Sequence, residues 1–171
     1  MKVFAQILGY LGTACLVASF QCKKEKELFY CQLMSGILFV FHYGLCGDFT
    51  GMAMDFIAFL RAVFMASGKK KLTGKPMMFA IIGVLTVLCV VTWEDVFSLC
   101  PMIALIASTV ALYTGVGDKI RIVQLVTTSP FWMIYNVHVM SLPGIICEAL
   151  DMLSVIVFFA KEKMAELMKE E

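Results

Sequence analysis

Long apolar stretches separated by short polar breaks make up most of the chain. The apolar runs are continuous and show no strict alternation, which favours helices over strands. A helix needs about 20 apolar residues to cross the hydrocarbon core of a bilayer. Lipid also leaves only helices and closed barrels able to satisfy the backbone. The pattern therefore predicts seven transmembrane helices, at residues 3–21, 28–45, 49–67, 76–93, 97–116, 120–140 and 142–160.

The overall composition supports this reading. Hydrophobic residues make up 61% of the chain and charged residues 16%, whereas soluble domains average about 25% charged residues. Lipid must therefore cover the outside of an all-α membrane protein. With 14 basic and 13 acidic residues, the net charge gives no reason to expect a nucleic-acid partner.

The basic residues are distributed unevenly over the connections between the predicted helices. Cytoplasmic loops carry the excess of Lys and Arg. One alternate set of connections holds only Lys2, and Arg61 lies inside the third predicted helix. This asymmetry predicts that the N-terminus lies outside and the C-terminus inside. The other set holds twelve basic residues: Lys23, Lys24, Lys26, Lys69, Lys70, Lys71, Lys75, Lys119, Arg121, Lys161, Lys163 and Lys169.

Two segments of the chain resemble each other at an offset of 92 residues. After one inserted residue, Gly51 aligns with Gly144 and Asp55 with Glu148. Parallel repeats about an axis along the membrane normal are a recurrent plan in transporters. We therefore expect a 3+1+3 arrangement: a bundle at 1–67, a connecting helix at 68–96, a bundle at 97–161 and a charged cytoplasmic tail at 162–171. The identical pairs are Gln32 and Gln124, Leu33 and Leu125, Phe39 and Phe131, and Tyr43 and Tyr135.

Acidic residues lie inside the apolar runs. Asp55 is in the third predicted helix, and Glu148 and Asp151 share one face of the seventh. An ionised carboxylate at the bilayer centre costs at least ~2.5–3.5 kcal/mol on insertion scales, so such groups face a bundle interior or a wet cavity. Two interpretations stay open for all three: a ligand or proton site, or a polar clamp between helices.

Aromatic and amide side chains give a second set of candidates. Trp132, Tyr135 and Asn136 share one helix face by their i, i+3, i+4 spacing. Aromatic walls with a few polar groups are how small-molecule pockets are built. His42 and Tyr43 fall near the matching place in the first copy, where anchoring at the membrane interface is the alternative.

Arg61 is six residues from Asp55, which turns it about 120° away on an ideal helix, so the two do not pair. A structural role with its charge snorkelling to the membrane surface is expected for Arg61, with a site role as the alternative. The seven cysteines show neither a CxxC motif nor zinc-ligand spacing. We expect no metal or other cofactor and, without any recognisable catalytic motif, no enzyme.

Three segments carry a resemblance to known families: SFQCKKEKELFYCQLMSGILFVFHYGLCGDFTGMAMDFIAFLR, KIRIVQL and SPFWMIYNV. They resemble the YgjV-type bacterial inner-membrane proteins, over most of the chain. More distantly, Ser19-Phe20-Gln21 and the W-x-x-Y run from Trp132 to Tyr135 are similar to the SWEET and PQ-loop transporters. In SWEET proteins an asparagine in the third helix of each repeat helps to hold the sugar, and here the nearest positions are Asp55 and Glu148.

The resemblance implies a small-molecule transporter or facilitator whose carboxylates suit a cationic metabolite or protons better than a sugar. Its partners would be the lipid bilayer and that ligand, with a homo-oligomer left open. The alternative is a non-transporting membrane protein, such as a sensor, scaffold or partner subunit, which uses its cytoplasmic Lys residues and charged tail.

Overall fold

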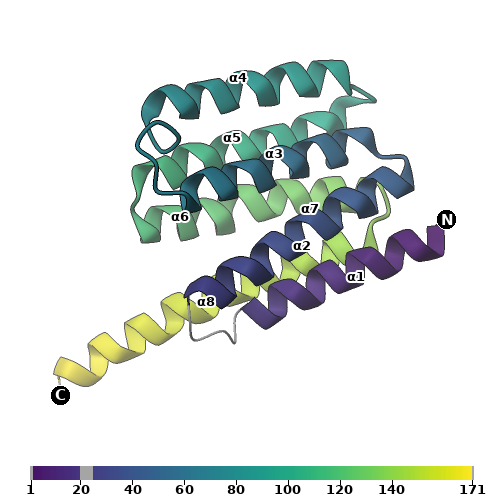
Figure 1. Ribbon diagram of the computed structural model, residues 1–171. Coiled ribbons are helices and arrows are strands. Elements are labelled where there is room, and N and C mark those ends of the chain that lie inside the picture. The colour runs from purple at the N-terminus through teal and green to yellow at the C-terminus, as the bar shows by residue number, and fades with distance from the viewer. Residues whose placement is uncertain (1, 20–24, 171) are drawn as a thin grey trace.

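The computed structural model describes residues 2–19 and 25–170, and these residues form helices and no strands (Figure 1). The all-helical prediction is confirmed, and within the described residues helix lies at each of the seven predicted positions, although the ends differ by a few residues. The elements are α1 (Lys2–Ser19), α2 (Glu25–Cys46), α3 (Phe49–Ala66), α4 (Lys75–Val91), a 3₁₀ turn (Val96–Ser98) that leads into α5 (Leu99–Thr114), α6 (Gly117–Val123), a π-helical turn (Gln124–Thr128), α7 (Ser129–His138) and α8 (Leu142–Glu170).

The surface of the bundle is apolar and much of its interior is polar. Val91 is 74% exposed and Phe4 is 58% exposed, whereas His42, Asn136 and Thr50 are fully buried. This is the reverse of a water-soluble protein. By length and composition, three helices can cross a membrane: Phe49–Ala66, Val96–Thr114 and Leu142–Ala165. Three shorter apolar helices cover Val3–Ser19, Tyr30–Cys46 and Lys75–Val91.

Two helices, α2 and α7, each pack between two others. α2 packs against α1 and α3, and α7 packs against α5 and α8. Contacts between α1 and α8 and between α3 and α5 close the arrangement, while α4 packs outside it on α3 and α5. Small residues allow the close approach of α1, because Gly9 lies against Pro143 and His42, and Gly12 against Phe39.

The sixth predicted span is one rod with a defect near its middle. Pro130 lacks a backbone N–H and is incompatible with a regular helical ladder at that point. The turn just before it, Gln124–Thr128, is π-helical, and the Ser129 N–H bonds to the Gln124 carbonyl. Pro can kink a helix or act as a hinge in it, and the interruption of the ladder here is this π-turn, immediately before Pro130.

α8 differs in length from the span predicted at 142–160. It continues as one helix to Glu170 and extends past the other helices toward the C-terminus (Figure 1). Residues 162–170 of the segment predicted as a separate charged tail are therefore helical. Lys161 and Lys163 are exposed on this extension.

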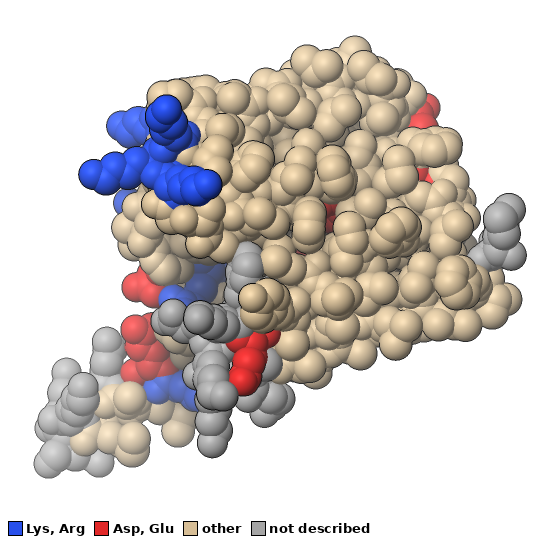
Figure 2. All heavy atoms as spheres, in the orientation of Figure 1, with Lys and Arg blue, Asp and Glu red and all other residues tan. Residues whose placement is uncertain are grey.

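Basic side chains mark one end of the bundle. The α3–α4 connection carries Lys69, Lys70 and Lys71, all exposed, and Figure 2 shows Lys and Arg side chains gathered where this connection lies. We call this the basic end. The opposite end, where α2 turns into α3 and α4 into α5, carries Asp48, Glu94 and Asp95 and is called the far end.

Candidate ligand-binding site

A polar cavity of about 190 Å³ lies between helices of the bundle, and we call it the central cavity. α1, α2, α3, α7 and α8 all contribute to its walls. Along α2 the lining runs from Tyr43 to Gln32, eleven residues or roughly 17 Å at 1.5 Å per residue toward the basic end. Gln32 is exposed, so the cavity reaches the surface there. The lining residues are Leu16, Gln32, Ser35, Gly36, Phe39, Tyr43, Asp55, Trp132, Asn136, Gly144, Cys147, Glu148 and Asp151.

Three carboxyl groups face this cavity: Asp55 from α3, and Glu148 and Asp151 from α8. Asp151 accepts a hydrogen bond of 3.1 Å from Gln124 Nε2. The Glu148 Oε2 atom is buried and has no hydrogen-bond partner. None of the described residues that line the cavity is Lys or Arg. The cavity therefore concentrates negative charge or bound protons without a fixed basic partner.

Aromatic rings form the wall of the cavity nearest the far end. The Tyr43 and Trp132 rings stack with their centroids 6.0 Å apart at 25°. The Tyr43 hydroxyl donates a 2.6 Å hydrogen bond to Asn136 Oδ1. This bond joins α2 to α7.

His42 lies beside the cavity but is not part of its lining. Its Nδ1 is 2.8 Å from the Ala5 carbonyl oxygen, and its Nε2 is 2.8 Å from Ser141 Oγ. A carbonyl oxygen only accepts, so Nδ1 carries a proton. In the neutral ring Nε2 then accepts from the Ser141 hydroxyl. His42 thus ties α1 and α2 to the residue that precedes α8. It does not line this cavity but lines a second one at the far end.

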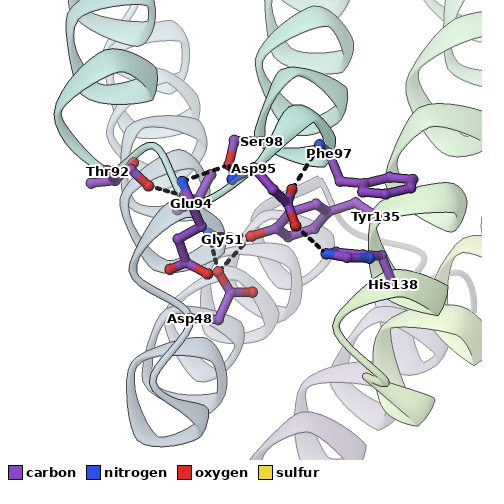
Figure 3. A network of polar contacts seen from close by, with 10 residues as sticks. Asp48, Gly51, Thr92, Glu94, Asp95, Phe97, Ser98, Tyr135 and His138 are labelled. Carbon is purple, nitrogen blue, oxygen red and sulfur yellow. Dashed lines mark hydrogen bonds and ion pairs between the residues drawn. The ribbon is translucent and has the colours of Figure 1, made fainter.

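Tyr135 also points away from the cavity, into a network at the far end (Figure 3). Its hydroxyl donates to Asp48 Oδ1 at 2.5 Å and accepts from the Gly51 backbone N–H at 3.1 Å. Asp48 Oδ1 also accepts from that N–H and so caps α3. Burial raises the pKa of the Asp48 carboxyl above its ordinary value, although the bonds from Tyr135 and Gly51 partly oppose this.

The far end holds a second cavity of about 270 Å³. His138 lies on its wall, and His138 Nε2 is 2.6 Å from Asp95 Oδ2. The His138 ring also stacks on Phe97, with 4.0 Å between centroids. Tyr43 lines both cavities, so its ring separates the central cavity from the far end. The second cavity is lined by His42, Tyr43, Cys46, Gly47, Asp48, Glu94, His138, Val139 and Ser141.

Arg61 does not contribute to either cavity. Its guanidinium donates to Ser108 Oγ at 2.8 Å, Thr109 Oγ1 at 2.7 Å and the Leu105 carbonyl at 3.3 Å, all on α5. The expectation that it snorkels to the membrane surface is wrong, because these acceptors hold it between α3 and α5. A structural role is what its contacts indicate.

Sequence reasoning overlooked the cap residues of the far end. Asp48 is the N-cap of α3 and Ser141 precedes α8, 93 residues later. Each accepts a hydrogen bond from the N–H three residues on, at Gly51 and Gly144. An Asp or Ser just before an apolar run is a helix-start signal that identifies both positions.

The helical fold, apolar exterior and polar interior define a helical membrane protein with an internal site. The sequence profile of the Imp-YgjV family, described as "Bacterial inner membrane protein", matches residues 3–164. The chain belongs to this family, which confirms the resemblance to YgjV-type proteins. No curated protein and no solved structure matches the chain, so neither search supports the more distant resemblance to SWEET and PQ-loop transporters.

Proposed function

We propose that this protein is a multi-pass transporter or facilitator of small molecules and not an enzyme. The observation that carries the proposal is the central polar cavity, which is open toward the basic end and closed toward the far end by Tyr43. Polar and ionisable residues inside a membrane bundle mark substrate and ion pathways by default. A route that is open at one end and blocked at the other is what alternating access requires.

We also propose a two-bundle architecture, which would suit a transporter. α3 and α8 begin 93 residues apart, the same offset that relates Asp55 to Glu148. Both carboxyls line one cavity. In this 3+1+3 arrangement, α1–α3 and α5–α8 form parallel bundles, α4 connects them, and the ligand site lies at their interface.

We further propose that the basic end faces the cytoplasm. Nearly all the Lys and Arg residues lie in or near the connections between the predicted spans at this end or on the C-terminal extension of α8, as expected for the cytoplasmic side. This orientation puts the N-terminus outside and the C-terminus inside, and makes the present conformation open to the cytoplasm.

Closure at the far end rests on three links between the proposed halves: the Tyr43–Asn136 bond, the His42–Ser141 bond and the Tyr135–Asp48 bond. Rocking of one bundle against the other would break these links and expose the cavity to the far end. The π-turn before Pro130 lies on the helix that carries Tyr135 and Asn136 and is the natural hinge, because its backbone ladder is already interrupted.

One observation favours a second function, that of a partner subunit or scaffold. α8 extends beyond the bundle at the basic end, and the extension exposes Met164, Leu167 and Met168 together with charged residues. An exposed amphipathic helix is a typical docking element. Under this alternative the bundle is only an anchor and the cavity never opens to the far end.

Sided cysteine labelling separates the two functions. Cys147 lines the cavity and can be kept as the only cysteine in a chain whose other cysteines are replaced by alanine. A membrane-impermeant cationic thiosulfonate reagent is added to sealed vesicles of either orientation. A Lys70→Cys variant reports the basic end and a Glu94→Cys variant the far end. A transporter exposes Cys147 to both faces, rapidly from the basic end and slowly from the other. Labelling from the basic end alone would overturn the transporter proposal.

A further inference from the structure

We infer that the ligand of the central cavity is a small organic cation, an alkylamine or quaternary ammonium compound. Its charge would lie between Asp55 and Glu148, and its alkyl groups would lie against Trp132. This inference rests on the proposed function only in taking the cavity as the place where the ligand binds.

The first argument is the charge of the lining. Asp55, Glu148 and Asp151 all face the cavity, and no Lys or Arg among the described lining residues offsets them. The nearest candidate cation on α3, the Arg61 guanidinium, is held by acceptors on α5 and does not line the cavity. An anionic ligand would be repelled, and a neutral one would leave the carboxyls without a counter-charge.

The second argument is an unused acceptor. Glu148 Oε2 is buried without any hydrogen-bond partner. A buried acceptor left unsatisfied costs about 1–3 kcal/mol and more when charged. Gln124 bonds to Asp151. Ser129 bonds to the Glu148 carboxyl, so the oxygen of Glu148 without a partner is Oε2 alone. Glu148 is therefore the carboxyl with spare capacity for a cationic donor, and Asp55, at the aligned position in the first repeat, is its counterpart across the cavity.

The third argument is the aromatic wall. Trp132 is the ring type that binds cations best over its face, and desolvated contacts of this kind contribute up to about 2 kcal/mol. Tyr43 stacks on Trp132 and its hydroxyl bond to Asn136 fixes the ring in place. An apolar ring beside a carboxyl suits an ammonium group that carries alkyl substituents better than a bare metal ion, which needs several oxygen ligands.

The size of the cavity limits the ligand further. About 190 Å³ is below the ~300–1,000 Å³ of sites for drug-sized molecules. The cavity also offers Gln32, Ser35 and Asn136 as hydrogen-bonding groups on its wall. A compact cation with one polar substituent matches this lining. No three of the described His, Cys, Asp or Glu side chains lie close enough to hold a metal ion together.

The test compares a cation with its neutral isostere. Choline and 3,3-dimethylbutan-1-ol have nearly the same shape and differ in the charge on the central atom. Each is titrated into the purified full-length protein in detergent, by calorimetry and by thermal shift. We expect saturable binding of choline, at least tenfold tighter than any binding of the alcohol. Equal affinity for the two would overturn the inference.

Three variants locate the site. Asp55→Asn and Glu148→Gln keep the side-chain shape and should each weaken choline binding about tenfold or more, and Trp132→Leu should also weaken it. Asp118→Asn is the matched control, because Asp118 is exposed at the basic end and pairs with Arg121. Its choline affinity should equal that of the wild type. The unfolding temperature of each variant without ligand shows whether it folds.

The outcomes also separate this inference from the transporter proposal. Absence of choline binding, with Cys147 still labelled from both faces, would reject the organic cation and leave the transporter proposal standing. Unchanged choline affinity in folded Asp55→Asn and Glu148→Gln proteins would equally reject it. Competitive displacement of choline by magnesium or calcium chloride at similar concentrations would assign the carboxyls to a metal ion instead.

Discussion

The Tyr43 hydroxyl donates a hydrogen bond to Asn136 Oδ1 across 93 residues of sequence, at a distance of 2.6 Å. Tyr43 is 2% exposed and Asn136 is 1% exposed, so water does not compete for the bond. Because Tyr43 also lines both cavities, this pair is the structural barrier between the centre of the bundle and its far end.

Tyr43→Phe should weaken this barrier. The substitution keeps the ring stacked on Trp132 and deletes only the donor, which leaves Asn136 Oδ1 buried and unpaired at a cost of about 1–3 kcal/mol to the closed form. Labelling of a single Cys147 from the far end should then accelerate about tenfold, since 1.36 kcal/mol corresponds to a factor of ten.

The control for this prediction is Tyr113→Phe. It deletes the same atom from a residue that bonds to the Leu72 carbonyl at the basic end and lines neither cavity. Its labelling rate should match the wild type. Equal rates for wild type and Tyr43→Phe would show that the hydrogen bond does not hold the far end closed.

Gly144→Ala should act on the same pair through sterics. A Cβ at this position would lie 2.2 Å from Asn136 Oδ1, closer than any real contact. Because Asn136 is buried and bonded, its displacement should lower the free energy of unfolding by about 1–3 kcal/mol. Gly83→Ala is the matched control. A Cβ there has no atom within 4 Å, and Ala in an exposed helical position should stabilise by ~0.4–1 kcal/mol.

The comparison is made by thermal unfolding of both variants in the same detergent. Opposite signs of the shift in unfolding temperature are expected. A stable Gly144→Ala protein would mean that Asn136 has room to move, and the bond to Tyr43 would then be weaker than its geometry indicates.

The stability of the far end should depend on pH through Asp48. Burial raises the pKa of this carboxyl above its ordinary value of 3.8, so the folded protein holds the proton more tightly than the unfolded chain. The Asp48 contribution to stability is therefore largest when the group is protonated. It is lost as pH rises from 3.8 through the pKa of the folded protein.

The matching measurement is the unfolding temperature of wild type and Asp48→Asn from pH 4 to pH 7. Asn keeps acceptors for the Tyr135 hydroxyl and the Gly51 N–H but does not ionise. The unfolding temperature of the variant, relative to wild type, should therefore increase with pH. A difference that stays constant over this range would mean that Asp48 titrates at its ordinary pKa.

The helices could be predicted from the sequence because lipid imposes a simple rule. Apolar runs of about 20 residues bounded by Gly and charged residues leave few alternatives, and α3 was predicted to within one residue. The length of α8 was not predicted, because the rule for lipid does not apply to its last segment. Its last segment, rich in Lys, Glu, Ala, Leu and Met, is too charged for lipid, but those residue types are strong helix formers in water.

The candidate site was only partly predictable. Asp55 and Glu148 were predicted as site residues because burying a carboxyl in lipid costs free energy, and both line the central cavity. Trp132, Tyr135 and Asn136 share a helix face, but such a face is broad, and Tyr135 points to Asp48 instead of into the cavity. Periodicity gives the side of a helix and not the partner that a side chain meets there.

The hydrogen-bond partners of His42 could not be predicted from the sequence either. In the sequence, a histidine next to a tyrosine near the end of an apolar run suggested either a pocket or a membrane-interface anchor. Its actual partners, Ala5 and Ser141, lie 37 and 99 residues away, and no local pattern connects them. Partners of this kind are set by packing between helices, which a single sequence does not specify.

Substitution of Arg61 tests whether this buried charge stabilises the fold without contributing to ligand binding. Its guanidinium reaches Ser108, Thr109 and the Leu105 carbonyl from α3. Lys has a single ammonium group and lacks the planar fork that spans several acceptors. Arg61→Lys should therefore leave acceptors on α5 unpaired and lower the free energy of unfolding by about 1–3 kcal/mol, measured by thermal unfolding in detergent.

Because Arg61 lines neither cavity, the choline affinity of the folded variant should equal that of the wild type. Weaker choline binding by Arg61→Lys, at a temperature where it is fully folded, would show that the α3–α5 contact also positions Asp55 for the ligand.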